Sequence, residues 1–158
     1  MQGNQIRFLI LIIILGFTQV LRSQDTANTT LIPIPDHLTK TAGFYEIPEN
    51  VSLNYSDVYE NEADLLETYL SGFGVSVYHG KEDTGGIRLL HVENTADSEY
   101  QLKVDEDGIT LQATSREGIL YGVQTLRQLF FFAREQEGKI PCLQIEDAPN
   151  FSYRGMHL

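Results

Sequence analysis

Residue types that could support catalysis or metal binding occur throughout this chain, but they do not gather into a recognisable site. The four histidines are widely spaced: His37, His79, His91 and His157. None of them has the i, i+4 spacing of a helical metal pair. The densest acidic run, Asp105–Asp107, lacks the twelve-residue ligand spacing of an EF-hand loop and is typical of a solvated turn. We therefore expect no metal site in the chain.

A nucleophilic site is equally hard to find in the sequence. Cys142 is the only cysteine, and it lies in a strand-like run where a buried, small apolar residue is expected. The chain contains no GxSxG elbow that would present a catalytic serine. Gly85 and Gly86 belong to no GxGxxG or GxxxxGK phosphate-binding loop. The residues alone therefore indicate no catalytic group and no bound cofactor.

The amino-terminal residues have the form of an export signal. Arg7 precedes an unbroken apolar run, Phe8–Phe17, after which the sequence becomes more polar. This run is about half as long as the ~20 residues that a membrane-spanning helix needs. We therefore expect residues 1–23 to be a cleaved signal peptide and residues 24–30 to be a polar leader, with no stable membrane span. An uncleaved anchor reaching Leu21 is the alternative.

The charge balance excludes nucleic acid as an expected partner. The chain has 22 acidic and 11 basic residues, which gives a net charge of −11. Cleavage of residues 1–23 would remove Arg7 and Arg22 but no acid, and would leave a net charge of −13. Such a protein repels nucleic acid phosphates and anionic membrane surfaces. Export would place it in a periplasmic, extracellular or lysosome-like compartment.

The first half of the mature chain predicts short strands and one helix. Leu31–Pro35 has the alternating prolines of an edge strand, and Gly43–Tyr55 predicts two strands broken by a turn. Asp57 and Glu60 have the spacing of a capping box, so a helix is expected to begin there and to end near Gly72. Its buried face is predicted from the apolar spacing: Leu65, Leu66, Tyr69 and Leu70. Two further strands are expected after it: Val75–Tyr78 and Ile87–Val92.

The second half predicts a hairpin, a long helix and a final strand. Tyr100–Thr114 alternates apolar and polar residues on both sides of an Asp-Gly turn, which is a strong hairpin signal. Thr114 and Glu117 have the spacing of a second capping box. Apolar residues then recur on one face of the expected helix: Ile119, Val123, Leu126 and Phe130. Gly118 and Gly122 on that helix indicate a close neighbour, and Lys139–Pro149 predicts the last strand.

Together these elements predict an α+β fold over residues 31–149. The expected architecture is a mainly antiparallel sheet that carries two helices. A mature chain of this length can bury one hydrophobic core, so we expect one domain.

The sequence resembles the family 20 glycoside hydrolases, the β-N-acetylhexosaminidases, in two stretches: Gly108–Leu129 and Ile140–Leu158. The order of the two stretches and their separation along the chain are also similar to those in the family. Members carry an amino-terminal α+β domain with a similar hairpin and long helix, and Leu31–Pro35 is similar to their opening strand. The domain is followed by an I-x-D-x-P-x-F-x-x-R-G junction, which this chain matches: Ile145, Asp147, Pro149, Phe151, Arg154 and Gly155. The resemblance implies that residues 150–158 begin a (β/α)₈ barrel. A whole barrel takes about 250 residues, so the chain is expected to be a fragment, truncated within the first barrel strand.

The resemblance also implies an activity. Members remove terminal β-linked N-acetylglucosamine or N-acetylgalactosamine by retaining hydrolysis, in which the acetamide of the substrate supplies the nucleophile. The family's catalytic Asp-Glu pair is expected beyond Leu158, so no catalytic residue is assigned within this chain, which should be inactive alone. Glu146 and Asp147 are expected to be structural. Arg154 matches the family arginine that binds hydroxyls of the terminal sugar, and is the predicted substrate-binding residue.

Two alternatives stay open from the sequence. The family 84 hexosaminidases have a similar leading domain and a similar Arg-Gly junction, although the residues after Gly155 favour family 20. The second alternative is a non-catalytic module that binds a carbohydrate or a partner. Otherwise the expected partners are a glycan with a terminal N-acetylhexosamine and the barrel domain of the same protein.

Overall fold

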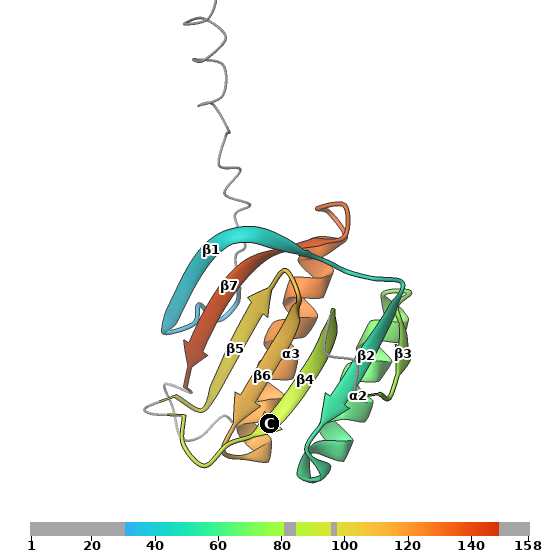
Figure 1. Ribbon diagram of the computed structural model, residues 1–158. Coiled ribbons are helices and arrows are strands. Elements are labelled where there is room, and N and C mark those ends of the chain that lie inside the picture. Colours follow the sequence, from blue (N-terminus) through green and yellow to red (C-terminus); the bar gives the residue numbers. More distant parts are fainter. Residues whose placement is uncertain (1–30, 81–84, 96–97, 149–158) are drawn as a thin grey trace, which may run out of the picture.

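The computed structural model describes residues 31–80, 85–95 and 98–148. This part of the chain forms one sheet of seven strands, and two α-helices pack on it (Figure 1). The strands have these bounds: β1 His37–Glu46, β2 Asn50–Tyr55, β3 Ser76–Tyr78, β4 Gly86–His91, β5 Tyr100–Asp105, β6 Gly108–Ala113 and β7 Lys139–Asp147. The helical elements have these bounds: the 3₁₀ turn η1 Asp57–Tyr59, α2 Glu60–Gly72 and α3 Arg116–Ala133.

The expected α+β class with two helices is confirmed, but the sheet is mixed rather than mainly antiparallel. Its strand order is β1-β7-β5-β6-β4-β2-β3. The β1–β7, β7–β5 and β5–β6 pairs are antiparallel, whereas the β6–β4, β4–β2 and β2–β3 pairs are parallel. The helix α2 returns the chain between β2 and β3, which makes these two strands parallel neighbours. The strand β5 lies between β4 and β6 in sequence and pairs with β6 as a hairpin, so β4 and β6 are also parallel. As the pairings show, β2, β3, β4, β6 and β7 all run in the same direction.

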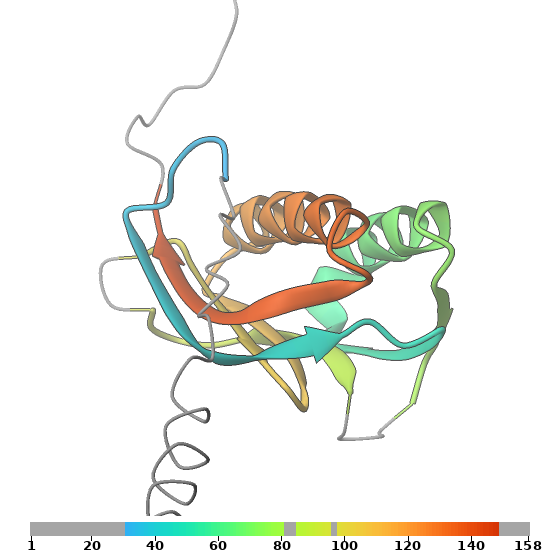
Figure 2. The same cartoon turned by 90° about the horizontal axis from the view of Figure 1, so that it is seen from above.

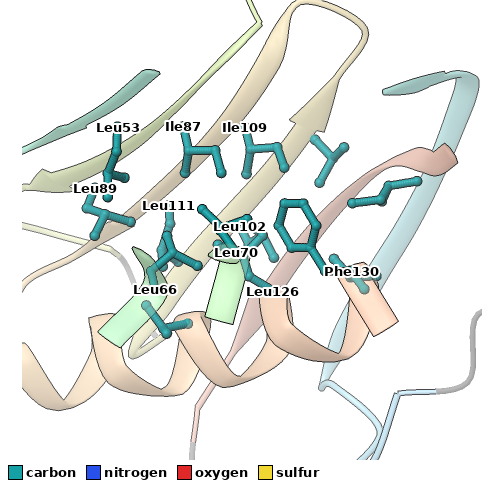
Figure 3. Packing of buried hydrophobic residues seen from close by; sticks show 14 of the residues in the cluster. Leu53, Leu66, Leu70, Ile87, Leu89, Leu102, Ile109, Leu111, Leu126 and Phe130 are labelled. Atoms are coloured by element: carbon teal, nitrogen blue, oxygen red, sulfur yellow. The ribbon is translucent and has the colours of Figure 1, made fainter. Parts of the chain in front are cut away.

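The two helices cover one face of the sheet, and β1 and β7 bend strongly along their length (Figure 2). The apolar residues of alternating strand positions face these helices, as Figure 3 shows: Leu53, Ile87, Leu89, Leu102, Ile109 and Leu111 from the sheet, with Leu66, Leu70, Leu126 and Phe130 from the helices. The opposite face is polar. There Arg88 Nη2 donates to Thr110 Oγ1 over 3.0 Å, and Gln112 Nε2 donates to Gln101 Oε1. One hydrophobic layer between sheet and helices therefore holds this domain together.

The expected edge strand at Leu31–Pro35 is wrong, because β1 begins only at His37. This segment lies instead on α3. The backbone N–H of Ile32 donates to Gln128 Oε1 over 2.9 Å, and Gln128 Nε2 donates to the Ile32 carbonyl over 3.0 Å. Prolines at 33 and 35 lack the N–H groups that a ladder needs, so a side chain satisfies the backbone here in place of a neighbouring strand.

Neither expected capping box forms as predicted. The cap of α3 is Ser115, one residue later than expected, and its Oγ accepts from the Gly118 N–H over 3.0 Å. The chain before α2 makes the η1 turn, and neither η1 nor α2 has a side-chain cap bond. The hydroxyl of Ser56, which precedes η1, accepts from the His91 N–H over 3.0 Å instead. A long-range bond to β4 thus replaces the local cap.

The close approach expected at Gly118 and Gly122 is confirmed. A Cβ on Gly118 would collide with the backbone carbonyl oxygen of Glu99, and a Cβ on Gly122 would collide with the side chain of Leu111. These glycines therefore let α3 lie directly against β6 and against the segment that leads into β5.

Gly118→Ala is expected to lower the free energy of unfolding by about 1–3 kcal/mol. Gly122→Ala should cost less, because the leucine side chain can move whereas the Glu99 carbonyl belongs to fixed backbone. Each substitution also gains about 1 kcal/mol of helix propensity. This gain cancels when the two changes in the free energy of unfolding are compared, so their difference reports the packing around each glycine. Urea unfolding followed by circular dichroism measures both. Equal costs at the two positions would contradict this account of the helix contact.

Candidate functional site

Polar groups gather at the edge of the sheet where β2, β4, β6 and β7 end, which we call the carboxyl edge. In open sheets with parallel strands, this is the edge at which functional residues commonly lie. Here it also contains the exit of the domain, because β7 ends at Asp147 and leads into residues 149–158. Arg154, the predicted substrate-binding residue, lies outside the described residues, and so do Gly155 and His157.

Asp147 accepts hydrogen bonds from three groups at this exit. Its Oδ1 accepts from the Asp36 N–H over 3.1 Å, and its Oδ2 accepts from the Tyr100 hydroxyl over 3.4 Å. Its backbone carbonyl accepts from the Glu99 N–H over 2.9 Å. The Tyr100 hydroxyl in turn lies 2.8 Å from Thr125 Oγ1 on α3. This side chain therefore joins the entry of the domain, β5, α3 and β7.

Tyr100 keeps its proton in this network. Burial raises the pKa of its phenol well above the usual range, the hydrogen bond with Thr125 lowers it, and the Asp147 carboxylate raises it again. A neutral phenol donates to the carboxylate, while its oxygen can accept from the threonine hydroxyl. The hydrogen bonds of Asp147 join elements of the domain to one another.

A second polar group at the carboxyl edge centres on Tyr59. Its hydroxyl donates to the Ala113 carbonyl over 2.8 Å, so the bond of 2.9 Å to His91 Nδ1 requires the imidazole to be the donor. The hydrogen bonds thus select the tautomer with a proton on Nδ1. Burial, and then the Glu62 carboxylate, raise the pKa of Tyr59. These hydrogen bonds connect η1 to the ends of β4 and β6.

Glu62 also links the two helices. Its Oε1 accepts from Arg116 Nε over 3.1 Å and from Arg116 Nη2 over 3.0 Å. The carboxylate is largely buried, and among the described atoms its Oε2 has no hydrogen-bond partner. The Arg116 side chain is half exposed, so solvent screens the pair. The contact orients α2 against the first turn of α3.

The structure does not bring the other predicted candidates together into a site. Asp105–Gly108 forms the tip of the β5–β6 hairpin, where Asp105 pairs with Lys103 over 2.9 Å. His79 lies 3.4 Å from Glu67, whereas His91 is hydrogen-bonded to Tyr59. Within residues 31–80, 85–95 and 98–148, no three His, Cys, Asp or Glu side chains are grouped so that they could hold a metal ion. None of the helices in these ranges is long and apolar enough to cross a membrane.

Cys142 is buried, with 2% of its surface exposed, beneath a polar hollow of about 450 Å³ near the hairpin tip. Burial raises the pKa of its thiol, and the Glu106 and Asp105 carboxylates raise it further. Because the thiolate is the reactive form, the folded protein should protect this cysteine.

We expect a disulfide reagent such as dithionitrobenzoate to label Cys142 at least ~100-fold more slowly in the folded chain than in urea, because labelling needs an opening of the core. Raising the pH from 7 to about 8.5 should accelerate the labelling of both forms by a similar factor, because the thiol that reacts is exposed in each case and titrates near that pH. Phe131→Cys places a second thiol on the exposed face of α3 and serves as the fast control. Labelling of Cys142 at the rate of that control would contradict the burial.

Sequence reasoning did not single out Tyr59, Tyr100 or Thr125. Each lies at an element boundary or on a helix that the pattern predicts, but nothing local indicates the partner of its hydroxyl. The one available signal is a tyrosine or threonine at a position that should be buried, where a hydroxyl needs a hydrogen bond.

The family model for glycosyl hydrolase family 20, domain 2, matches residues 28–148. A β-hexosaminidase of Porphyromonas gingivalis is 27% identical over 141 residues, which cover 81% of this chain and 18% of that relative. The chain thus spans less than a fifth of this relative's length.

Solved structures agree with this assignment. The exo-β-N-acetylglucosaminidase of family 20 from Vibrio harveyi, in complex with N-acetylglucosamine, is 25% identical with a TM-score of 0.68, over 82% of this chain and 20% of that one. CpGH84D has a TM-score of 0.69 over 81% of this chain and 25% of its own, at 16% identity, which shows a shared fold alone. The family model, which covers most of the chain, decides between the two expected families. This chain belongs to glycosyl hydrolase family 20, with its described residues forming the family's domain 2.

Proposed function

We propose that this chain is the amino-terminal part of an exported β-N-acetylhexosaminidase. The observation that carries the proposal is the match of residues 28–148 to domain 2 of the family, followed directly by the junction sequence that ends in Arg154-Gly155. The domain itself supplies no catalytic group in the residues described above. Its role in the enzyme is to hold the start of the catalytic domain.

The proposed reaction is substrate-assisted hydrolysis with retention of configuration. The acetamide oxygen of the substrate attacks the anomeric carbon, and a glutamic acid protonates the leaving oxygen. An aspartate orients the acetamide. Both acids are expected in the chain that follows Leu158, within a (β/α)₈ barrel whose first strand begins in residues 150–158.

Arg154 is the one residue of this chain to which we assign a role in substrate binding. A guanidinium presents five N–H donors in a fixed plane, which suits adjacent hydroxyl oxygens of a sugar. The substrate class is a glycan with a terminal β-linked N-acetylglucosamine or N-acetylgalactosamine. The Vibrio harveyi relative, which is described with N-acetylglucosamine, supports this choice.

Export is the remaining part of the proposal. It rests on Arg7 and the apolar run Phe8–Phe17. Cleavage would give a mature protein that begins near Gln24. The amino-terminal sequence of the secreted protein tests it directly, and a mature protein that still begins at Met1 would contradict it.

We expect the 158-residue chain to show no turnover of a chromogenic N-acetyl-β-glucosaminide, and the product of the intact gene to hydrolyse it. The reason is that the acid and the stabilising carboxylate are both expected beyond Leu158. The same assay with both proteins at equal concentration measures this difference. Turnover by the 158-residue chain would overturn the fragment assignment, and an inactive gene product would favour a non-catalytic binding module.

A further inference from the structure

We propose that the outer face of α3, together with the entry segment Leu31–Pro35, is the surface on which domain 2 holds the catalytic domain of the enzyme. The inference rests on the proposed function, because it takes the occupant to be the barrel expected after Leu158. It goes beyond that function by naming where the two domains meet. We call this surface the α3 patch, and its exposed apolar residues define it: Ile32, Ile34, Leu120 and Phe131.

The helix α3 has apolar residues on two faces. Its inner face packs on the sheet and includes Phe130. On the outer face Leu120 is exposed, and Phe131 exposes 62% of its surface. With Gln124 and Arg127 between them, these residues are spaced i, i+4, i+7 and i+11, which forms one stripe along a helix. A helix whose outer face meets only water is expected to be polar or charged there.

The outer face of α2 provides a comparison within the same domain. Both helices pack on one face of the sheet (Figure 2), so their outer faces are equivalent in the fold. The exposed side chains of α2 are all polar or acidic: Glu60, Asn61, Asp64, Thr68 and Ser71. The contrast with Leu120 and Phe131 indicates that the outer face of α3 is suited to contact with protein.

The entry segment extends this apolar surface. Ile32 is exposed, and Ile34 exposes 81% of its surface. The two hydrogen bonds between the Ile32 backbone and the Gln128 amide hold the start of the segment on α3. The bond from the Asp36 N–H to Asp147 Oδ1 holds its end. Both isoleucines are therefore presented by a backbone that is anchored on each side of them.

A hollow of about 610 Å³ lies between the entry segment and α3. Its apolar lining includes Ile32, Phe131 and Phe132. Arg127 and Glu135 supply one charge of each sign, although the whole chain has twice as many acidic as basic residues. Aromatic residues and arginine are enriched, and acidic residues are depleted, at the centres of protein interfaces. The composition of the hollow therefore favours a protein surface as its occupant.

The chain leaves domain 2 beside this patch. At the end of β7, Asp147 accepts from the N–H of Asp36, which directly follows the entry segment. The Tyr100 hydroxyl links the same carboxylate to Thr125 in the middle of α3. Figure 2 shows the end of β7 next to the segment that enters the domain. Under the proposed function, the barrel begins within a few residues of this point, in residues 150–158.

The position of the exit selects the catalytic domain as the occupant. A domain joined by a short linker is present at a millimolar effective concentration, so a modest apolar patch can hold it. A separate partner or a second copy lacks this advantage and generally needs about 1,000 Å² of buried surface. This chain matches only 18% of the Porphyromonas gingivalis relative, so most of that relative lies outside the shared domain.

The test places a cysteine on the α3 patch. Phe131→Cys is made in the 158-residue chain and in the intact gene product, and mass spectrometry of the peptide that contains it follows alkylation by iodoacetamide. We expect alkylation at least ~10-fold slower in the intact gene product, because a covered thiol reacts only when the domains separate. Asn61→Cys, on the outer face of α2, is the matched control and should react within about 2-fold equally in the two proteins.

Ile34→Asp tests the same contact through stability. In the intact gene product the new carboxylate would be desolvated without a partner, so the midpoint of thermal unfolding should fall by about 4 °C or more. In the 158-residue chain the side chain stays in water, and the midpoint should change by less than about 1 °C. Asn61→Asp adds the same charge on the outer face of α2 and should leave both midpoints within about 1 °C.

The proposed function and the docking surface fail in different ways. A wild-type gene product that does not hydrolyse a chromogenic N-acetyl-β-glucosaminide would overturn the proposed function. The docking inference is wrong if that protein is active and Phe131→Cys reacts equally fast in both proteins. Slow alkylation already in the 158-residue chain would also overturn it, and a rate that rises on dilution would then assign the patch to a second copy.

Discussion

Replacing Phe130 by alanine is expected to lower the free energy of unfolding of the domain by about 3–5 kcal/mol. The Phe130 ring is 2% exposed and stacks on Phe73 just beyond α2, with ring centroids 6.0 Å apart and planes at 26°. It lies where the two helices and the sheet meet (Figure 3). Removal would leave a cavity that the surrounding strands cannot fill, and would also remove the aromatic contact.

Phe131→Ala is the natural control, because Phe131 is the next residue of α3 and is 62% exposed. It should change the free energy of unfolding by less than about 1 kcal/mol. Both substitutions replace phenylalanine by alanine in the same helix, so the gain in helix propensity cancels in the comparison. Urea unfolding of the chain from Gln24 gives both values. A difference of less than about 1 kcal/mol between them would refute the placement of Phe130 in the core.

Arg154→Ala in the intact gene product is expected to lower kcat/KM by about 100-fold or more. Each hydrogen bond from a charged donor contributes about 1.5–3 kcal/mol, and two lost bonds to sugar hydroxyls would account for such a loss. Arg154→Lys should recover only part of it, because an ammonium cannot reproduce the planar pair of donors. The effect should appear chiefly in KM if the bonds are equally strong in ground and transition states.

Arg134→Ala provides the control for lost charge, since Arg134 is an exposed arginine directly after α3. It should leave kcat/KM unchanged within about 2-fold. Steady-state kinetics with a chromogenic N-acetyl-β-glucosaminide separates the two parameters. Unchanged kinetics in Arg154→Ala would remove this residue from the substrate site.

Local patterns predicted the elements that depend on neighbours in sequence. The alternation around Asp-Gly correctly predicted the β5–β6 hairpin, because its register is set by the turn. The apolar spacing of Leu66, Leu70, Leu126 and Phe130 predicted the buried faces of α2 and α3. The small residues at Gly118 and Gly122 predicted a close contact. In each case the physical cause acts within one turn of a helix or one pair of strands.

Other features depended on partners that lie far away in sequence. Thr114 and Ser115 are equally suitable caps, and only the direction in which β6 enters α3 selects Ser115. Ser56 could have capped a helix locally but binds the backbone of His91 instead. Leu31–Pro35 has a strand-like pattern, yet Gln128, 96 residues away from Ile32, satisfies its backbone.

The sequence by itself determined the fold class, the family and the candidate substrate-binding residue, because these depend on periodicity and on a junction motif that is local in the chain. The tertiary structure decided the parallel half of the sheet. There β4 pairs with β6 although β5 lies between them in sequence, and the local pattern does not predict which strands become neighbours. It also decided the surroundings of Asp147. An Asp at the end of a strand can accept hydrogen bonds from any donor that packing brings within reach, and only the folded chain brings Asp36, Tyr100 and Thr125 together around that exit.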